Sequence, residues 1–232
     1  MAVTYNSHIV KDGLILCLDP ASVGSYSGSG STWKDLAKNA NGTLINDATF
    51  SSANEGVITF DGTDDYVDCG DSASLEFSSG ESFTLSIWFK GTSARGCLLG
   101  KGYDTGSQDR PWYMLWCNSA SDEDVNIFLR SVGGGSFKTT DNNNIQDNEW
   151  HNIVGVYDAS AATITTYTDA VAGTPVGSVS AQAYGTNNSP FVIGKHNNEE
   201  INGSVGPVHV YNKALSAAEV LKNYNVIKRR YL

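Results

Sequence analysis

The sequence lacks long apolar runs, a basic N-terminal region and an excess of positive charge. No apolar stretch approaches the roughly 20 residues that a membrane-spanning helix needs, so we expect no membrane span. The chain does not open with a basic segment followed by an apolar one, which predicts no secretory signal. The net charge of −10 argues against binding to nucleic acid or to anionic membranes.

Cysteine is scarce and scattered along the chain. Cys17, Cys69, Cys97 and Cys117 form no Cys-x-x-Cys pair, and none has a histidine nearby at the spacing of zinc ligands. A zinc site is therefore not expected. Three of the four lie in apolar, strand-like patterns, which favours buried free thiols and leaves one disulfide as the open alternative.

Residues that form turns and strands are abundant. The 232 residues include 24 glycines, five tryptophans, eight phenylalanines and eleven tyrosines, enough aromatic side chains for a two-layer core. Short alternating segments recur between turn residues, most clearly at 83–90, where Phe83, Leu85, Ile87 and Phe89 share one face. This pattern predicts an all-β antiparallel two-sheet sandwich forming a single domain over 1–232, with 1–12 and 226–232 as terminal arms.

The segment 202–211 shows the same period of two. Val208 and Val210 lie on one face of the expected strand, and His209 and Tyr211 lie on the other. Another short strand is expected at 176–179. In the order of the chain, 202–211 precedes the one segment with a helical period.

A short helix is expected after residue 215. Ser216 and Glu219 have the spacing of a capping box, in which each side chain accepts a hydrogen bond from the other's backbone N–H. Leu215 and Val220 have the spacing of a hydrophobic staple. The expected apolar stripe of the helix consists of Val220, Leu221 and Tyr224.

Four motifs stand in a fixed order along the chain. They are Phe60-Asp-Gly-x-x-Asp-Tyr-Val, Phe83-x-Leu-Ser-Ile-Trp-Phe, Trp150-His-x-Ile-Val-Gly-Val-Tyr and Asn202-Gly-x-Val-Gly-x-Val-x-Val-Tyr. This ordered set resembles the concanavalin A-like jelly rolls, and it is most similar to their laminin G-like and pentraxin-like branch. The resemblance covers roughly residues 13–225 and implies a jelly-roll sandwich, but this fold hosts many functions.

Glycoside hydrolases share this fold, and their catalysis requires two carboxylates that flank the scissile bond. The acidic residues 122–124 lie in a loop that precedes a strand, and Glu76 and Glu81 are isolated. The sequence also contains no Gly-x-Ser-x-Gly, no His-Glu-x-x-His and no phosphate-binding loop. We therefore expect a non-enzymatic protein, with a glycoside hydrolase as the disfavoured alternative.

The resemblance to the pentraxin-like branch implies a calcium site in loops at the rim of a sheet. The positions that match its ligands are Asp109, Asn197, Asn198 and Glu199. Lys195 brings a positive charge to the same loop, which opposes a bound cation. The acidic group Asp61, Asp64 and Asp65 fits either a metal loop or a turn in which carboxylates cap backbone N–H groups, and we favour the turn.

Aromatic residues beside polar groups are the other candidate site, because they suit glycan binding. Trp112 and Trp116 share a face of the strand expected at 111–117. Two interpretations are open: the rings fill the space between the sheets, or they stand on a sugar-binding face. The residues that we expect to stack on a sugar are Tyr103, Trp112 and His196.

Positive charge is concentrated at the end of the chain, because residues 213–232 carry five bases and one acid. These bases form either a solvated end or a tail that docks on an acidic neighbour. The docking candidates are Lys222, Lys228, Arg229 and Arg230.

The opening of the chain, with Trp33-Lys-Asp-Leu-Ala and Asn41-Gly-Thr-Leu, resembles domains of bacterial surface proteins and of bacteriophage virion proteins. From this resemblance we expect a virion decoration protein on a capsid or tail, in contact with other virion proteins or copies of itself and binding host glycans. The alternative is a calcium-assisted carbohydrate-binding domain at a bacterial cell surface or in the extracellular medium.

Overall fold

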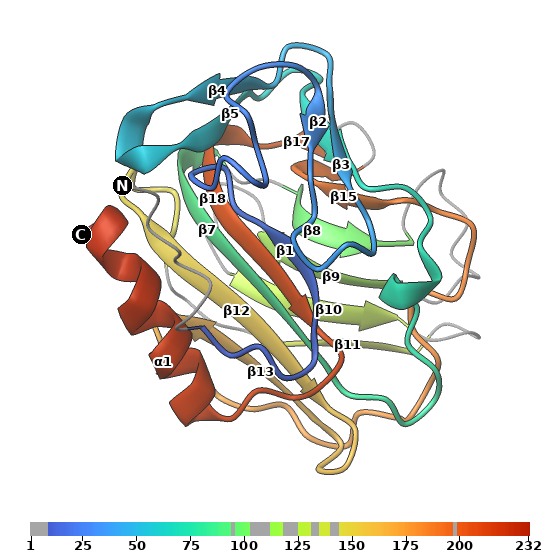
Figure 1. The fold of residues 1–232 in the computed structure, drawn as a ribbon. Helices are drawn as coiled ribbons and strands as arrows, with labels where there is room; N and C mark the ends of the chain where they lie inside the picture. The colour runs from blue at the N-terminus through green and yellow to red at the C-terminus, as the bar shows by residue number, and fades with distance from the viewer. Residues whose placement is uncertain are drawn as a thin grey trace.

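The computed structural model describes residues 9–93, 96–102, 112–117, 125–130, 135–139, 144–196 and 199–232. These residues form two large antiparallel β-sheets that pack face to face, with an α-helix lying along the outside of one of them (Figure 1). The expected all-β two-sheet sandwich is therefore confirmed. No helix in the described ranges is long and apolar enough to cross a membrane.

The first sheet, sheet A, has eight strands in the order β14-β13-β12-β7-β18-β5-β4, with β1 paired to the second half of β18. Its strands are β1 (Leu14–Leu18), β4 (Thr49–Ser51), β5 (Val57–Asp61), β7 (Phe83–Ser93), β12 (His151–Asp158), β13 (Thr163–Thr168), β14 (Val171–Ala172) and β18 (Asn202–Tyr211). The strand expected at 176–179 is wrong, because only Val176 pairs there, in a single bridge with Ile164.

The second sheet, sheet B, also has eight strands, in the order β11-β10-β9-β8-β15-β6-β3-β2. Its strands are β2 (Thr32–Trp33), β3 (Gly42–Ile45), β6 (Tyr66–Asp68), β8 (Gly96–Lys101), β9 (Trp112–Cys117), β10 (Val125–Arg130), β11 (Ser136–Lys138) and β15 (Phe191–Ile193). A small hairpin joins β16 (Lys195–His196) to β17 (Glu199–Glu200). Short 3₁₀ turns cover Ala53–Glu55, Ala73–Leu75 and Lys228–Arg230.

The main core lies between the two sheets. Alternate residues of β7, including Leu85, Ile87 and Phe89, face sheet B and are fully buried. Tyr113 and Leu115 of β9 meet them from sheet B and are equally buried. Burial of side chains of this size stabilises a fold by about 1.5–3 kcal/mol each. All four cysteines are buried free thiols.

Helix α1 (Ala217–Ile227) begins with the expected capping box. The Ser216 hydroxyl accepts a hydrogen bond from the Glu219 backbone N–H, and the Glu219 carboxylate accepts one from the Ser216 N–H at 2.9 Å. Leu215 and Val220 pack in one apolar cluster with Tyr211 of β18. The capping box and the staple are thus both confirmed.

The buried stripe of α1 differs from the one expected. Leu221 is 48% exposed, so its assignment to the stripe is wrong. The buried positions are Val220, Asn223 and Ile227. Asn223 is buried because its side chain accepts a hydrogen bond from the Val10 backbone N–H at 2.8 Å and donates one to the Tyr211 hydroxyl at 2.9 Å.

The end of the chain packs on sheet A and does not extend from it. The Arg230 guanidinium is buried and donates hydrogen bonds from one nitrogen to both carboxylate oxygens of Asp19, at 3.0 and 3.1 Å. Tyr231 lies against Trp88 and Trp150, with ring centroids 4.7 and 4.3 Å away. Arg230 was expected in a docking tail, and this expectation is wrong because its charge is neutralised within the chain.

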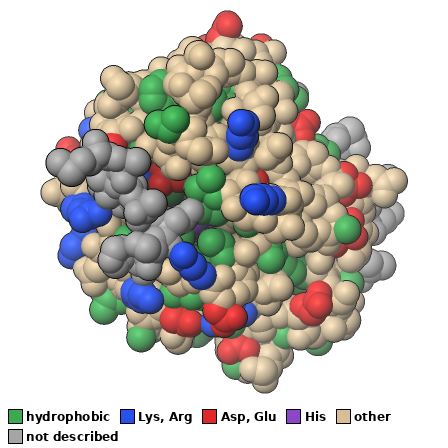
Figure 2. Space-filling model, viewed as in Figure 1, with side chains coloured by type: hydrophobic (Ala, Val, Ile, Leu, Met, Phe, Trp, Pro, Cys, Tyr) green, Lys and Arg blue, Asp and Glu red, His purple; other side chains and the backbone are tan. Residues whose placement is uncertain are grey.

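Some basic side chains of this segment do stay at the surface. Lys222 and Arg229 are exposed, and Lys and Arg side chains stand along the side of the molecule where α1 lies (Figure 2). The Lys228 ammonium lies over the Tyr224 ring at 5.2 Å. The positive patch is therefore smaller than the sequence suggests.

Removal of the Arg230 side chain should destabilise the fold. The change Arg230→Ala leaves the Asp19 carboxylate in a largely buried position without its partner, which typically costs about 3–5 kcal/mol. Urea denaturation measures the loss. The matched change at an exposed base, Lys222→Ala, should shift the free energy of unfolding by less than about 0.5 kcal/mol. Equal effects of the two changes would contradict the buried ion pair.

A histidine joins two loops at the edge of sheet A. His151, the first residue of β12, places Nδ1 2.8 Å from the Asp169 carboxylate and Nε2 3.2 Å from Asp147. Asp169 also accepts a hydrogen bond from the Asn152 backbone N–H at 2.8 Å. The hydrogen bond to Asp169 and the two negative charges raise the pKa of His151, although partial burial opposes the shift.

This arrangement makes part of the stability depend on pH. Because the folded pKa of His151 is raised, its contribution is complete below the unfolded pKa of about 6.5 and is lost as pH rises through the folded pKa. The free-energy difference between wild type and His151→Ala should therefore be larger at pH 5.5 than at pH 9. Urea denaturation at the two pH values tests this, and a difference independent of pH would refute it.

Candidate functional site

The outer face of sheet A lies beneath α1 and the end of the chain, and the outer face of sheet B lies on the opposite side of the sandwich. Side chains alternate along β9, so Tyr113, Leu115 and Cys117 face the core while Trp112, Met114 and Trp116 face outward. The first open interpretation of the tryptophans, that they fill the space between the sheets, is therefore wrong.

Strand pairing carries this outward face across to the edge of sheet B. Asn126 of β10 lies opposite Trp116, and Phe128 lies opposite Met114. Lys138 of the edge strand β11 lies opposite Phe128 on its other side. Directly opposed residues have Cβ atoms about 4.5–5.5 Å apart, so these side chains form one continuous surface.

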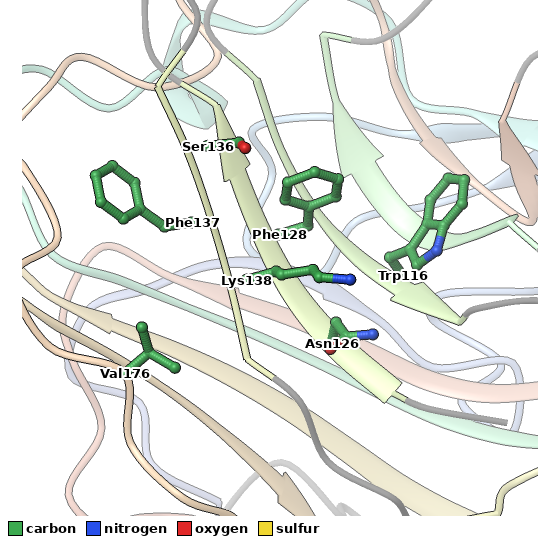
Figure 3. A pocket seen from close by; sticks show the side chains of 7 residues that line it. All are labelled: Trp116, Asn126, Phe128, Ser136, Phe137, Lys138 and Val176. Carbon is green, nitrogen blue, oxygen red and sulfur yellow. The ribbon is translucent and has the colours of Figure 1, made fainter. Parts of the chain in front are cut away.

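This surface borders a hollow of about 550 Å³. Its lining consists of Trp116, Asn126, Phe128, Ser136, Phe137, Lys138 and Val176. Figure 3 shows the first three of these and Lys138 on one side of β11, with Phe137 and Val176 on the other side. The hollow therefore begins on the outer face of the sheet and reaches around its edge strand. We refer to this place as the β9–β11 hollow.

The aromatic rings of the β9–β11 hollow are in two layers. Trp112 is only 3% exposed and packs with Cys97 and Met114. Its ring meets the Phe128 ring edge to face, with centroids 4.5 Å apart. Phe128 and Trp116 are partly exposed. Trp112 thus forms a buried layer beneath the partly exposed rings of Phe128 and Trp116. It presents no exposed ring face for the sugar stacking that the sequence predicts for it.

The other two expected sugar-binding residues are not described well enough to be placed relative to this hollow. Tyr103 lies outside the described residues. His196 is described only in its backbone, which pairs with Glu199 in the β16–β17 hairpin. The sequence pattern puts Trp116 on the same face as Trp112 but does not show which face lies outward, and it does not point to Asn126, Phe128 or Lys138 as site residues. The period-2 alternation of β10 could have revealed Phe128.

The calcium ligands implied by the family resemblance are mostly outside the described residues, since Asp109, Asn197 and Asn198 are not among them. Glu199 is partly buried in β17. Lys195 lies in the same hairpin, with its ammonium 3.9 Å from the Glu200 carboxylate and 4.3 Å from the centre of the Tyr66 ring. The described residues of this hairpin therefore bring a lysine ammonium next to the two glutamates, which is a poor set for a divalent ion.

Asp61, Asp64 and Asp65 form the one acidic group in the described ranges whose carboxylates converge, within 4.8 Å of one another. Asp65 is buried and accepts hydrogen bonds from the backbone N–H groups of Asp61 and Asp47, both at 2.9 Å. Asp61 accepts one from the Thr63 N–H at 2.7 Å. Burial raises the pKa of Asp65. These contacts are those of the capping turn that the sequence favoured.

The β9–β11 hollow of this sandwich is lined by aromatic side chains and a few polar groups, as ligand pockets commonly are. The chain belongs to the concanavalin A-like lectin/glucanase superfamily, whose laminin G-type profile matches residues 61–221. The fold that the sequence motifs implied is thereby confirmed. None of the curated proteins is significantly similar to the chain in sequence.

Solved structures agree on the fold. Domain 4 of AbnA, an extracellular arabinanase of Geobacillus stearothermophilus, was solved in complex with arabinotriose; it matches with a TM-score of 0.69 and 13% identity over 91% of this chain and 98% of that one. The binding domain of botulinum neurotoxin serotype D, solved with N-acetylneuraminic acid, matches with a TM-score of 0.67 and 10% identity over 95% of this chain. The chain spans about half of that domain, 52% of its length.

The two layers of aromatic rings should respond differently to mutation. Trp112→Ala removes a buried ring and should destabilise the fold by about 3–5 kcal/mol. Trp116→Ala removes a partly exposed ring from the same strand and should cost less than about 1.5 kcal/mol. Urea denaturation compares the two variants. A larger loss for Trp116→Ala would show that the layers are assigned the wrong way round.

Proposed function

We propose that this protein is a non-enzymatic carbohydrate-binding module that holds a glycan in the β9–β11 hollow. The observation that carries the proposal is the pair of partly exposed rings, Trp116 and Phe128, on the outer face of sheet B beside an amide and an ammonium group. The C–H faces of a sugar ring pack against aromatic rings, and its hydroxyl groups require hydrogen-bond partners at the edge of the same surface.

The similar structures give independent support at the level of class. Two of them, the arabinanase domain and the neurotoxin domain, were solved with a sugar bound. Hydrolysis of a glycosidic bond would require two carboxylates at the site. The described lining of the β9–β11 hollow contains no acidic residue, which is why we assign binding and not catalysis.

We place this binding on an exposed surface, either of a bacteriophage particle or of a bacterial cell. The support is the resemblance of the opening segment around Trp33 and Asn41 to domains of such proteins. Lys222 and Arg229 remain the exposed bases through which the segment after β18 could contact an acidic neighbour. Mass spectrometry of purified phage particles tests the virion setting, and absence of the chain from them would favour the cell surface.

A glycan array followed by titration calorimetry tests the binding function. Wild type should bind at least one glycan, and Trp116→Ala and Phe128→Ala should each weaken that binding by about tenfold or more, since loss of a stacked ring removes about 1.4 kcal/mol or more. The matched control is Leu221→Ala, which removes an exposed apolar side chain from α1. A flat array for wild type, or equal binding by all variants, would refute the function.

The same titrations with calcium or with a chelator test the calcium-assisted alternative. If calcium holds the glycan, the chelator should abolish binding and lower the melting temperature. If the hollow acts through its side chains alone, both quantities should stay unchanged.

A further inference from the structure

The β9–β11 hollow carries positive charge in an acidic protein. The chain has a net charge of −10, yet the only charged side chain in the described lining of the hollow is Lys138. Arg130 stands on the same face of β10 as Phe128, two residues further along, and lies opposite Ser136 of β11. Both bases are therefore within reach of a molecule seated on the Phe128 ring.

Lys138 is available for a ligand. Its side chain is exposed, and no carboxylate of the described residues pairs with it. Some other lysines are held by acids, in contrast: Lys101 is buried against Asp71, and Lys213 lies 2.9 Å from both Asp12 and Glu219. An unpaired ammonium group beside an aromatic ring can neutralise an anion without first breaking an ion pair.

The neighbouring polar group points the same way. Ser136, on the same face of the same short strand, offers a hydroxyl donor two residues from Lys138. Lysine and arginine are donors without an acceptor, so the polar edge of the hollow is rich in donors. A neutral sugar presents hydroxyl groups that both donate and accept, whereas a carboxylate or sulfate group only accepts. The edge at β11 therefore complements an anionic group better than a neutral one.

We propose that the β9–β11 hollow selects an anionic glycan, with the sugar ring on Trp116 and Phe128 and its carboxylate or sulfate group against Lys138. This inference rests on the proposed carbohydrate-binding function and adds the chemical class of the ligand. Arg130 and Ser136 lie beside the same anionic group. Because the contact is charged and exposed, its strength falls as salt screens it.

Affinity electrophoresis in gels that contain a polysaccharide tests the selection. The carboxylate probe is polygalacturonate, with its fully methyl-esterified form as the neutral match, and the sulfate probe is carrageenan, with desulfated carrageenan as its match. We expect the wild-type protein to bind at least one anionic polymer about tenfold more tightly than its neutral match, and to lose most of this preference at 0.5 M salt. The pair that shows the preference identifies the anionic group.

Variants of Lys138 separate charge from shape. Lys138→Gln should weaken binding to the anionic polymer by about tenfold and leave binding to the neutral match within twofold, whereas Lys138→Arg should retain the preference. Lys222→Gln, on the opposite side of the sandwich, is the control for net charge. Unchanged melting temperatures show that the variants are folded.

Two kinds of failure are distinguishable. In the first, the protein binds neutral glycans as tightly as anionic ones, Trp116→Ala weakens this binding and Lys138→Gln leaves it unchanged. The proposed anionic class of ligand is then wrong and the binding function stands. Should the wild-type protein bind no glycan on any array or gel, the binding function itself is wrong, and this inference falls with it.

Discussion

Each strand of the sandwich presents alternate side chains to opposite faces, so the strands that build the layer between the sheets also determine what stands outside. In β9 the inward set is Tyr113 and Leu115, which are fully buried against sheet A. The same backbone then holds Trp112 and Trp116 outward at fixed positions. The core and the candidate site are thus two faces of one strand, and a shift of one residue in its register would exchange them.

The two outer faces of the sandwich differ in what lies over them. The outer face of sheet A carries large apolar rings such as Trp88 and Tyr211, and the segment after β18 lies over them. Arg230 ends this cover with an ion pair to Asp19, which lies directly after β1. Burial and the nearby Arg230 charge lower the pKa of His209 to about 4, so this histidine is neutral inside the cover at neutral pH. The β9–β11 hollow lies on the other sheet.

Much of the fold could be predicted from local pattern. The alternation at 83–90 and the capping box at Ser216 depend on residues close together in the sequence, and the structure has both. The predicted apolar stripe of α1 is wrong at Leu221. The buried residue is instead Asn223, whose side chain contacts Val10 and Tyr211, and a helical period does not reveal such contacts. The polar residue satisfies its hydrogen bonds across elements that are distant in the sequence.

The site was harder to predict for a related reason. Both faces of β9 are apolar, so alternation shows that Trp112 and Trp116 share a face without showing which face is inside. The difference between them, one buried beneath Phe128 and one partly exposed, depends on the neighbouring strand. Lys138 joins the site only because β11 pairs with β10 in one register. Such pairings are set by the tertiary fold and not by any spacing in the sequence.

The placement of the last residues has a practical consequence. Tyr231 is anchored among Trp88 and Trp150 on the side of sheet A, whereas Leu232 is 69% exposed. A tether attached after Leu232 would therefore leave the protein on the side opposite the β9–β11 hollow. Molecules immobilised on a support through such a tether would present the outer face of sheet B to the solution, in a uniform orientation.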